Sequence, residues 1–249
     1  YTAPGHASVY TGTTPSVHGI VGNEWFHRTL KKDVYCTDDA TVTTLVPGTE
    51  TEGKMSPRNL QSSTITDELK MATNFKGKVI GISIKDRGAI LPAGHFADWA
   101  FWYTKTGEFI SSSYYGTALP TWADDFNKEK NYSKYAEKGW GLLKAKETYN
   151  ESLPDDNPYE GKLYKKTPFF PYNMKEMLDN NDAGVLRVSP YGNNLVLDFA
   201  KRAIEKESLG KDAITDFLAV SFSSTDYIGH NFGPRSIEIQ DTYLRLDES

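Results

Sequence analysis

The sequence predicts an α/β fold, a mixed or parallel sheet flanked by helices, for three reasons. Two short apolar runs, Lys78–Ile84 and Asp216–Ser223, have the length and composition of buried parallel strands. An amphipathic helical pattern precedes each run, over residues 64–72 and over Asn194–Glu207. The resulting alternation of helices and strands is typical of α/β domains.

Local signals indicate where two of the helices begin. Pro4 is tolerated in a first helical turn, so a short helix is expected to begin with Thr2 or Ala3 as its cap. The helix over residues 64–72 has Ser63 or Thr64 as a candidate cap, with acidic residues in the following turn. Both helices lie early in the chain, close to the residues that carry the candidate chemistry.

The middle of the chain differs from the rest. From residue 99 to residue 187 aromatic side chains are frequent, and residues 104–107 indicate a hairpin turn. We therefore expect three parts: residues 1–98 as the first part of a catalytic α/β domain, residues 99–187 as an aromatic-rich insertion or cap, and residues 188–249 as the second part of that domain. The aromatic residues are expected to form a small core of their own.

Composition excludes several classes of protein. The net charge is -5 over 249 residues, and no basic stripe indicates binding of a nucleic acid duplex. The apolar runs are too short for a membrane span. Cys36 is the single cysteine, so no intrachain disulfide can form, and it is expected to be an inert buried residue. The oligomeric state is left open.

Thr2 is the first candidate for chemistry. It precedes Pro4-Gly5-His6 at the predicted start of a helix, where backbone N–H groups and the helix dipole favour negative charge. Such a position would stabilise an alkoxide and a bound phosphate. Most threonines at helix starts serve only as caps, so Thr2 alone is a weak signal.

Lys85 and Arg87 form the second candidate site, at the end of the Lys78–Ile84 strand. In an extended segment, side chains two residues apart share one face, so both cations could reach one anion. Arginine offers a bidentate fork and lysine a point charge, which together suit a dianionic phosphoryl group. Taken alone, the pair could equally be a solvated charged turn.

Asp226 and His230 follow the Asp216–Ser223 strand and form the third candidate site. Carboxylate and imidazole groups are ligands for Zn²⁺, but a catalytic zinc site needs at least three protein ligands. Only two are present here. Without other support, Asp226 could be a cap and His230 a surface residue.

Together, these segments resemble the alkaline phosphatase superfamily. Residues 2–6 and 10–23 are similar to its nucleophile region, in the branch that uses threonine and includes the nucleotide pyrophosphatase/phosphodiesterases. Residues 83–95 and 221–230 resemble the lysine/arginine and zinc-ligand segments of its monoesterase-type bacterial alkaline phosphatases. The resemblance extends from Thr2 to about Asp247 and implies an alkaline-phosphatase-like α/β fold.

The resemblance also implies a role for each candidate residue. Thr2 would be the nucleophile, with its oxygen on one of two zinc ions, and the Asn23 amide would donate to a phosphoryl oxygen. Lys85 and Arg87 would hold the other phosphoryl oxygens, and the second zinc would be bound by Asp226 and His230. The three remaining histidines of these segments would be structural: His6, His18 and His95. The substrate would be a small phosphate ester, and the protein would be periplasmic or secreted.

Several residues of the family pattern are absent from these 249 residues. The pattern has an Asp before the nucleophile, an Asp-His pair after the Asp226 segment and a later His. A final helical pattern starts near Ser236 and still runs at Leu246, so the chain is expected to be incomplete at both ends. With so few ligands, this part alone is expected to bind zinc weakly and to lack turnover.

Two other functions remain open. A phosphodiesterase of the same branch is one alternative, although a diester has one charge and less use for two cations. A non-catalytic phosphate- or glycan-binding relative is the other, although it would be expected to lose Thr2 or the Lys85/Arg87 pair. A sulfatase is disfavoured, because sulfatases have Cys or Ser in a Cys/Ser-x-Pro-x-Arg setting and this segment is Thr2-Ala-Pro-Gly-His6.

Overall fold

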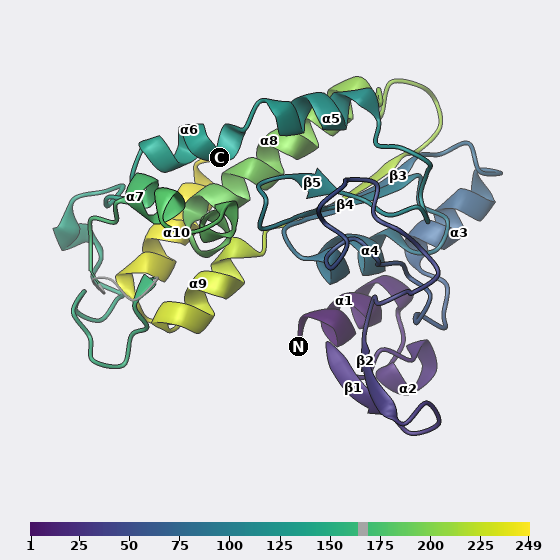
Figure 1. Ribbon diagram of the computed structural model, residues 1–249, viewed down its shortest axis with the longest axis horizontal. Coiled ribbons are helices and arrows are strands. Elements are labelled where there is room, and N and C mark those ends of the chain that lie inside the picture. The colour runs from purple at the N-terminus through teal and green to yellow at the C-terminus, as the bar shows by residue number, and fades with distance from the viewer. Residues whose placement is uncertain (164–168) are drawn as a thin grey trace. The chain divides into compact units, whose positions relative to one another are not determined.

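The computed structural model describes residues 1–163 and 169–249, which form two units (Figure 1). Unit 1 contains residues 1–104, 109–125 and 199–221, and unit 2 contains residues 105–108, 126–198 and 222–249. The predicted three-part division of the chain stays a prediction. None of the helices in the described ranges is long and apolar enough to cross a membrane.

Unit 1 is built on a mixed four-stranded sheet with the order β5-β4-β3-β6. The three parallel strands are β3 (Val79–Ser83), β4 (Trp99–Tyr103) and β6 (Phe217–Ser221), and β5 (Phe109–Ile110) pairs antiparallel to β4. Every residue of β3 is buried, as expected for a central parallel strand. The α/β class and the two predicted strands are confirmed, and the hairpin expected at residues 104–107 joins β4 to β5.

The helix α4 (Asp86–Ala93) covers one face of this sheet. It packs on β3, and α1 (Thr2–Thr11) packs on α4, as Figure 1 shows. The approach of α4 depends on Gly81, because a Cβ atom there would lie 2.2 Å from the Ala89 carbonyl oxygen. The other elements of unit 1 are α2 (Pro15–His18), the antiparallel pair β1 (Glu24–His27) and β2 (Lys32–Tyr35), and α3 (Ile65–Ala72).

A small apolar core lies beneath α1. It contains Ala3 and Ala7 of the helix, together with Ile20, Leu91 and Cys36. Burial, together with the nearby charge of Asp86, raises the pKa of the Cys36 thiol to about 12. Cys36 is therefore an unreactive core residue, as the sequence indicated.

Unit 2 is helical in the residues described. Its elements are α6 (Asn131–Glu137), a 3₁₀ turn at Lys146–Thr148, α7 (Met174–Asp179), a 3₁₀ helix at Ala183–Val188, α9 (Ser224–Phe232) and α10 (Ile237–Asp247). The helices α5 (Thr121–Lys128) and α8 (Pro190–Lys206) have residues in both units. The side chains of Trp140 and Tyr172 are fully buried in unit 2 and contact Phe232, which lies outside the predicted aromatic segment. Phe101 and Trp122 pack on Phe199 in unit 1, so the segment does not form one core of its own.

Some helix boundaries differ from the prediction. The first helix is capped by Tyr1, so Thr2 is its first helical residue and not its cap. The eighth helix begins at Pro190, four residues before the predicted Asn194, because proline is accepted in a first turn. The helix predicted from Ser236 is confirmed, with the Ser236 side chain accepting from the Ile239 N–H.

The cap of α3 is a buried network that should respond to pH. Thr64 and Asp67 form a reciprocal capping box, and the Asp67 carboxylate also accepts from the His95 ring at 2.9 Å. The second ring nitrogen of His95 lies 2.9 Å from the Leu60 carbonyl oxygen, so both nitrogens have acceptors. The hydrogen bond to Asp67 raises the pKa of His95, and burial partly opposes this.

We expect unit 1 to lose stability as the pH rises past neutrality. A histidine whose pKa is raised by folding stabilises the fold below its unfolded pKa, and this contribution is lost as the pH rises through the folded pKa. The melting temperature should therefore be higher at pH 6 than at pH 9, by a margin that His95→Gln removes. The substitution should cost about 1–3 kcal/mol at low pH, because Asp67 loses a charged partner. An unchanged pH dependence in His95→Gln would contradict this assignment.

Candidate active site

Thr2 lies at the positive end of α1. The helix begins at this residue, and the Tyr1 side chain makes no capping hydrogen bond. The N–H groups of a first helical turn have no partner within the helix, and together they carry a partial positive charge. The Thr2 hydroxyl is therefore placed where an alkoxide or a bound phosphate would be stabilised.

Asn23 is fixed beside Thr2 by two hydrogen bonds. Its Oδ1 accepts from the Ala3 N–H at 2.9 Å, which ties the side chain to the first turn of α1. Its backbone carbonyl accepts from the Cys36 N–H at 2.9 Å, which ties it to the end of β2. Because Oδ1 faces the helix, the NH₂ group is the end of the amide that can donate to a ligand. This is the orientation that the predicted role requires.

Lys85 and Arg87 lie just beyond the carboxyl end of β3, where ligands gather in α/β sheets. An extended segment was expected here, but a helix begins at Asp86 instead. Lys85 is the cap of α4, its N–H donates to Ser83 Oγ at 3.1 Å, and Arg87 is in the first helical turn. The first turn of the helix, and not strand alternation, places the two cations.

The Arg87 guanidinium is held by two side chains that the sequence analysis did not assign. Its Nη1 donates to the Tyr35 hydroxyl at 2.6 Å, and Tyr35 in turn donates to Asp86 Oδ1 at 2.6 Å. Burial alone would lower the pKa of Arg87, but Tyr35 and Asp86 raise it overall, so the group stays cationic. Asp86 could have been suspected from the sequence, because it lies between the two predicted cations. Tyr35 could not, because no local sequence signal distinguishes it.

One donor of Arg87 remains without an acceptor. Its Nε is buried and has no hydrogen-bond partner among the residues that the structure describes. A buried N–H group left unpaired costs about 1–3 kcal/mol, so such groups are normally satisfied. An anion bound beside Arg87 would satisfy this donor.

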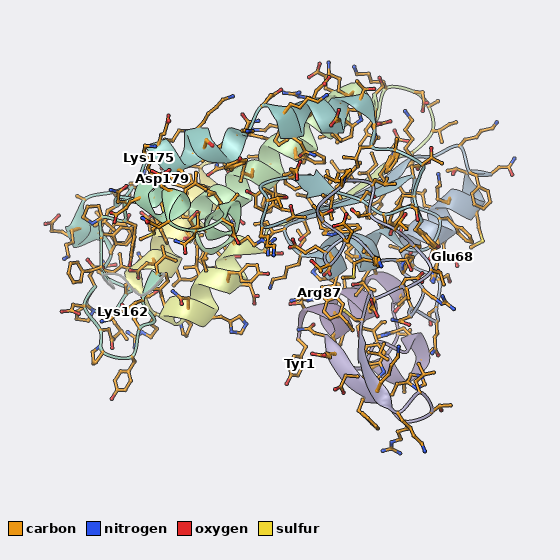
Figure 2. The ribbon with its side chains drawn as sticks, in the orientation of Figure 1. Tyr1, Glu68, Arg87, Lys162, Lys175 and Asp179 are labelled. Atoms are coloured by element: carbon orange, nitrogen blue, oxygen red, sulfur yellow. The ribbon has the colours of Figure 1, made fainter. Side chains whose placement is uncertain are left out.

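His6, on the same helix as Thr2, feels the charges of Lys85 and Arg87. It lies one turn after Thr2 on α1, and burial, followed by the charges of Lys85 and Arg87, lowers its pKa. The two cations therefore act on the helix that carries Thr2. Figure 2 labels Tyr1 and Arg87, at the start of α1 and in the first turn of α4. Thr2, Asn23, Lys85 and Arg87 thus all belong to unit 1, in which α1 packs on α4.

Asp226 and His230 lie in unit 2, on α9. They are one helical turn apart, with His230 Nε2 3.5 Å from Asp226 Oδ1, and both side chains are exposed. They line a cleft of about 440 Å³ whose other lining residues are Thr225, Gly229, Pro234, Ile239 and Tyr243. Within residues 1–163 and 169–249, no three His, Cys, Asp or Glu side chains form a metal-binding group.

The other histidines of the predicted segments make internal contacts. His18 is buried, its Nδ1 accepts from the Ile20 N–H at 3.1 Å, and its Nε2 lies 3.0 Å from Ser8 Oγ. Burial lowers its pKa, so the ring is neutral and Nε2 carries the proton. These contacts hold α1 against the loop after α2, as His95 holds the cap of α3.

Comparison with known proteins identifies the family. The sequence model of the type I phosphodiesterase / nucleotide pyrophosphatase family matches residues 1–249. The chain belongs to this family. The result confirms the resemblance to the alkaline phosphatase superfamily, of which the sequence analysis named this branch.

Two curated proteins are closely similar to the chain. Alkaline phosphatase PhoV of Synechococcus elongatus is 54% identical over 250 residues, covering 99% of this chain and 45% of that protein. A protein of Myroides odoratus named calcium-transporting ATPase is 53% identical, covering 99% of this chain and 46% of that protein. The chain spans about half the length of the curated relatives it matches.

Solved structures agree with the fold. The crystal structure of wild-type alkaline phosphatase PafA matches with a TM-score of 0.96 and 49% identity, covering 99% of this chain and 48% of that one. A second structure of PafA, a variant with one threonine, one asparagine, one lysine and one arginine replaced, matches with a TM-score of 0.96 and 48% identity. The alkaline-phosphatase-like α/β fold is therefore confirmed, and it corresponds to about half of the PafA chain.

Proposed function

We propose that the full-length protein hydrolyses phosphate monoesters through a phosphothreonine formed on Thr2, in a zinc-dependent reaction. One observation carries the proposal: Thr2 lies at the positive end of α1, Asn23 is tied to the same turn, and Arg87 presents a buried Nε with no partner in the described part of the chain. A threonine hydroxyl at the positive end of a helix, in the same unit as an unpaired guanidinium donor, suits attack on a phosphoryl group.

The relatives support the same assignment. PhoV and PafA, which cover nearly all of this chain, are named alkaline phosphatases. The four residues replaced in the PafA variant are a threonine, an asparagine, a lysine and an arginine, separated in that chain by 21, 62 and 2 residues. Thr2, Asn23, Lys85 and Arg87 have the same order and the same separations here.

In this reaction each residue of the proposed site would have a separate role. The Thr2 oxygen attacks the phosphorus atom as the bond from phosphorus to the ester oxygen breaks, and the hydroxyl proton leaves with the alcohol product. Water then attacks the phosphothreonine, which releases inorganic phosphate and restores the Thr2 hydroxyl. The Asn23 amide donates to one phosphoryl oxygen. Lys85 and Arg87 neutralise the charge on the others, which is the main contribution that a protein makes to phosphoryl transfer. Zinc, when bound, would lower the pKa of the hydroxyl group and stabilise the leaving oxygen.

The candidate ligands are of types that zinc accepts, but there are too few of them for a complete site. Asp226 and His230 are a carboxylate and an imidazole on one face of α9, and they would contribute two ligands to one ion. Thr2 would contribute its oxygen to the other. Further ligands have to come from other segments of the full-length protein.

The pair of cations favours monoesters over diesters. A monoester dianion has three non-bridging oxygens and two charges, whereas a diester has two such oxygens and one charge. Lys85 and Arg87 are therefore better used on a monoester. A phosphodiesterase remains the alternative within the family. A non-catalytic phosphate- or glycan-binding protein would not need the nucleophile. We further propose small phosphate esters as substrates, and a periplasmic or secreted location.

The full-length protein and the 249-residue chain should behave differently with zinc. We expect the full-length protein to hydrolyse a phosphate monoester faster than a matched diester, and to lose this activity on treatment with a chelator and regain it with zinc. The isolated chain should bind zinc weakly and show no turnover, because it supplies only two ligands for one ion. Steady-state kinetics and zinc titration by calorimetry measure both. Tight stoichiometric binding by the isolated chain would contradict the ligand assignment, and dominant diesterase activity would contradict the function.

A further inference from the structure

The hydrogen bonds around Tyr35 can have only one direction. A guanidinium group donates and cannot accept, so the Tyr35 oxygen must accept from Arg87 Nη1. The single hydroxyl proton of Tyr35 then goes to Asp86 Oδ1, at 2.6 Å. The result is a chain of charge-assisted bonds from carboxylate through phenol to guanidinium, and such bonds are stronger than neutral ones.

Both ends of this series of hydrogen bonds, Asp86 and Arg87, belong to α4. Asp86 Oδ1 also accepts from the Arg87 N–H at 2.5 Å, which fixes the carboxylate to the first turn of α4. The Arg87 guanidinium carbon lies 5.9 Å from the centre of the Tyr35 ring, which adds a cation–π contact. The arginine side chain therefore has contacts along the ring and at the hydroxyl.

Tyr35 also belongs to the hairpin that holds Asn23. It pairs with Glu24 in the β1–β2 register, and the residue after it, Cys36, donates its N–H to the Asn23 carbonyl. One strand end therefore orients two of the groups proposed to bind phosphate. The Tyr35 backbone carbonyl is held in turn by Asn59 Nδ2 at 3.2 Å.

We infer that Tyr35 and Asp86 are positioning residues for Arg87, which fix the rotation of its guanidinium so that Nε faces a phosphoryl group bound at Thr2. The inference rests on the proposed function. Without Tyr35, Arg87 Nη1 would be free to move to Asp86 Oδ1, which is 3.6 Å away. The guanidinium group would then rotate away from the substrate. The phenol keeps the two opposite charges from closing on each other.

The hydrogen bonds from Asp86 through Tyr35 to Arg87 should persist in alkaline solution. Burial, and next the charge of Asp86, raises the pKa of Tyr35 well above its ordinary value. The hydroxyl therefore keeps its proton at pH values where an ordinary tyrosine, with a pKa of about 10, begins to ionise. Asp86 and Arg87 thus stay linked at such pH values.

The test is Tyr35→Phe in the full-length protein, alone and combined with Arg87→Ala. We expect the single variant to lower kcat/KM for a phosphate monoester by about 10- to 100-fold, as expected for a misplaced binding group. Inhibition by inorganic phosphate should weaken by a similar factor. In the Arg87→Ala background the same substitution should cause no further loss, because the residue it positions is gone. Asp86→Asn should follow the same pattern.

Tyr135→Phe is the matched control, since the Tyr135 hydroxyl also donates to a carboxylate, that of Asp198, at 2.6 Å. Its kcat/KM should be unchanged. An active wild type with an impaired Arg87→Ala variant but a normal Tyr35→Phe variant would overturn this inference alone. An equal loss in both backgrounds would also overturn it, because it would indicate a general effect on the fold. A wild type without monoesterase activity would overturn the proposed function and this inference together.

Discussion

Replacing Thr2 by alanine in the full-length protein should lower kcat for phosphate monoesters by about 10⁴-fold or more, the scale seen when a covalent nucleophile is removed. The reason is the proposed covalent step, which no neighbouring hydroxyl can perform from the same helix position. The helix itself should persist, because Tyr1 and not Thr2 is its cap. Thr2→Ser should retain much of the activity, since it keeps a hydroxyl at the positive end of α1.

Steady-state kinetics and acid quenching measure this prediction. Quenching during turnover should trap a phosphoryl group on the peptide that contains Thr2, and Thr2→Ala should abolish that signal. Thr11→Ala is the matched control: Thr11 is the last residue of the same helix, and its hydroxyl donates to the Ala7 carbonyl at 2.7 Å. It should leave kcat unchanged. Wild-type turnover in Thr2→Ala would exclude Thr2 as the nucleophile.

The parts of the fold that could be predicted from the sequence are those set by local pattern. The β-branched apolar runs predicted β3 and β6, and they pair with each other in parallel, with Ile82 opposite Val220. The cap of α3 could be narrowed to Ser63 or Thr64, and the structure has Thr64, because a capping box with Asp67 is contained within four consecutive residues. In these cases short-range spacing decides the structure.

The parts that could not be predicted depend on contacts distant in sequence. The run Trp99–Tyr103 was assigned to the aromatic segment by its composition, yet it is a strand of the main sheet, because its backbone pairs with β3. Tyr35 reaches Asp86 across 51 residues, and a lone tyrosine in a short strand has no distinguishing pattern. The placement of Lys85 and Arg87 also differs from the prediction, since the first turn of α4 replaces the expected extended segment.

The site proposed for unit 1 would draw its donors from three separate segments. The α1 dipole acts on Thr2, the β1–β2 hairpin orients Asn23, and the first turn of α4 supplies the cations. Each segment is anchored by buried contacts, so the polar groups would need little reorganisation to bind an anion. Preorganised donors of this kind account for much of the rate enhancement in transfer reactions.

Replacing Lys85 or Arg87 by alanine should each lower monoester kcat/KM by about 10²- to 10³-fold, the usual cost of one preorganised donor. Diester hydrolysis should fall by less, because a diester places one charge, not two, near these groups. The ratio of monoester to diester activity should therefore shift toward the diester in both variants. Lys85 is 5% exposed and Arg87 lies against Tyr35, so neither charge is screened by bulk water to the extent of a surface residue.

Two exposed cations provide the controls. Arg58 pairs with Asp39 in unit 1, with a side chain that is 61% exposed, and Lys175, labelled in Figure 2, pairs with Asp179 in unit 2. Alanine at either position should leave both activities unchanged. Buried Asp39 keeps its hydrogen bonds to Thr41 and Ser56 without Arg58, and the exposed pair of Lys175 and Asp179 contributes little. If Lys85→Ala and Arg87→Ala reduced monoester and diester hydrolysis equally, the two cations would bind a feature common to both substrates. Their presence would then no longer favour a monoesterase over a phosphodiesterase, and the choice between the two functions would depend on substrate kinetics alone.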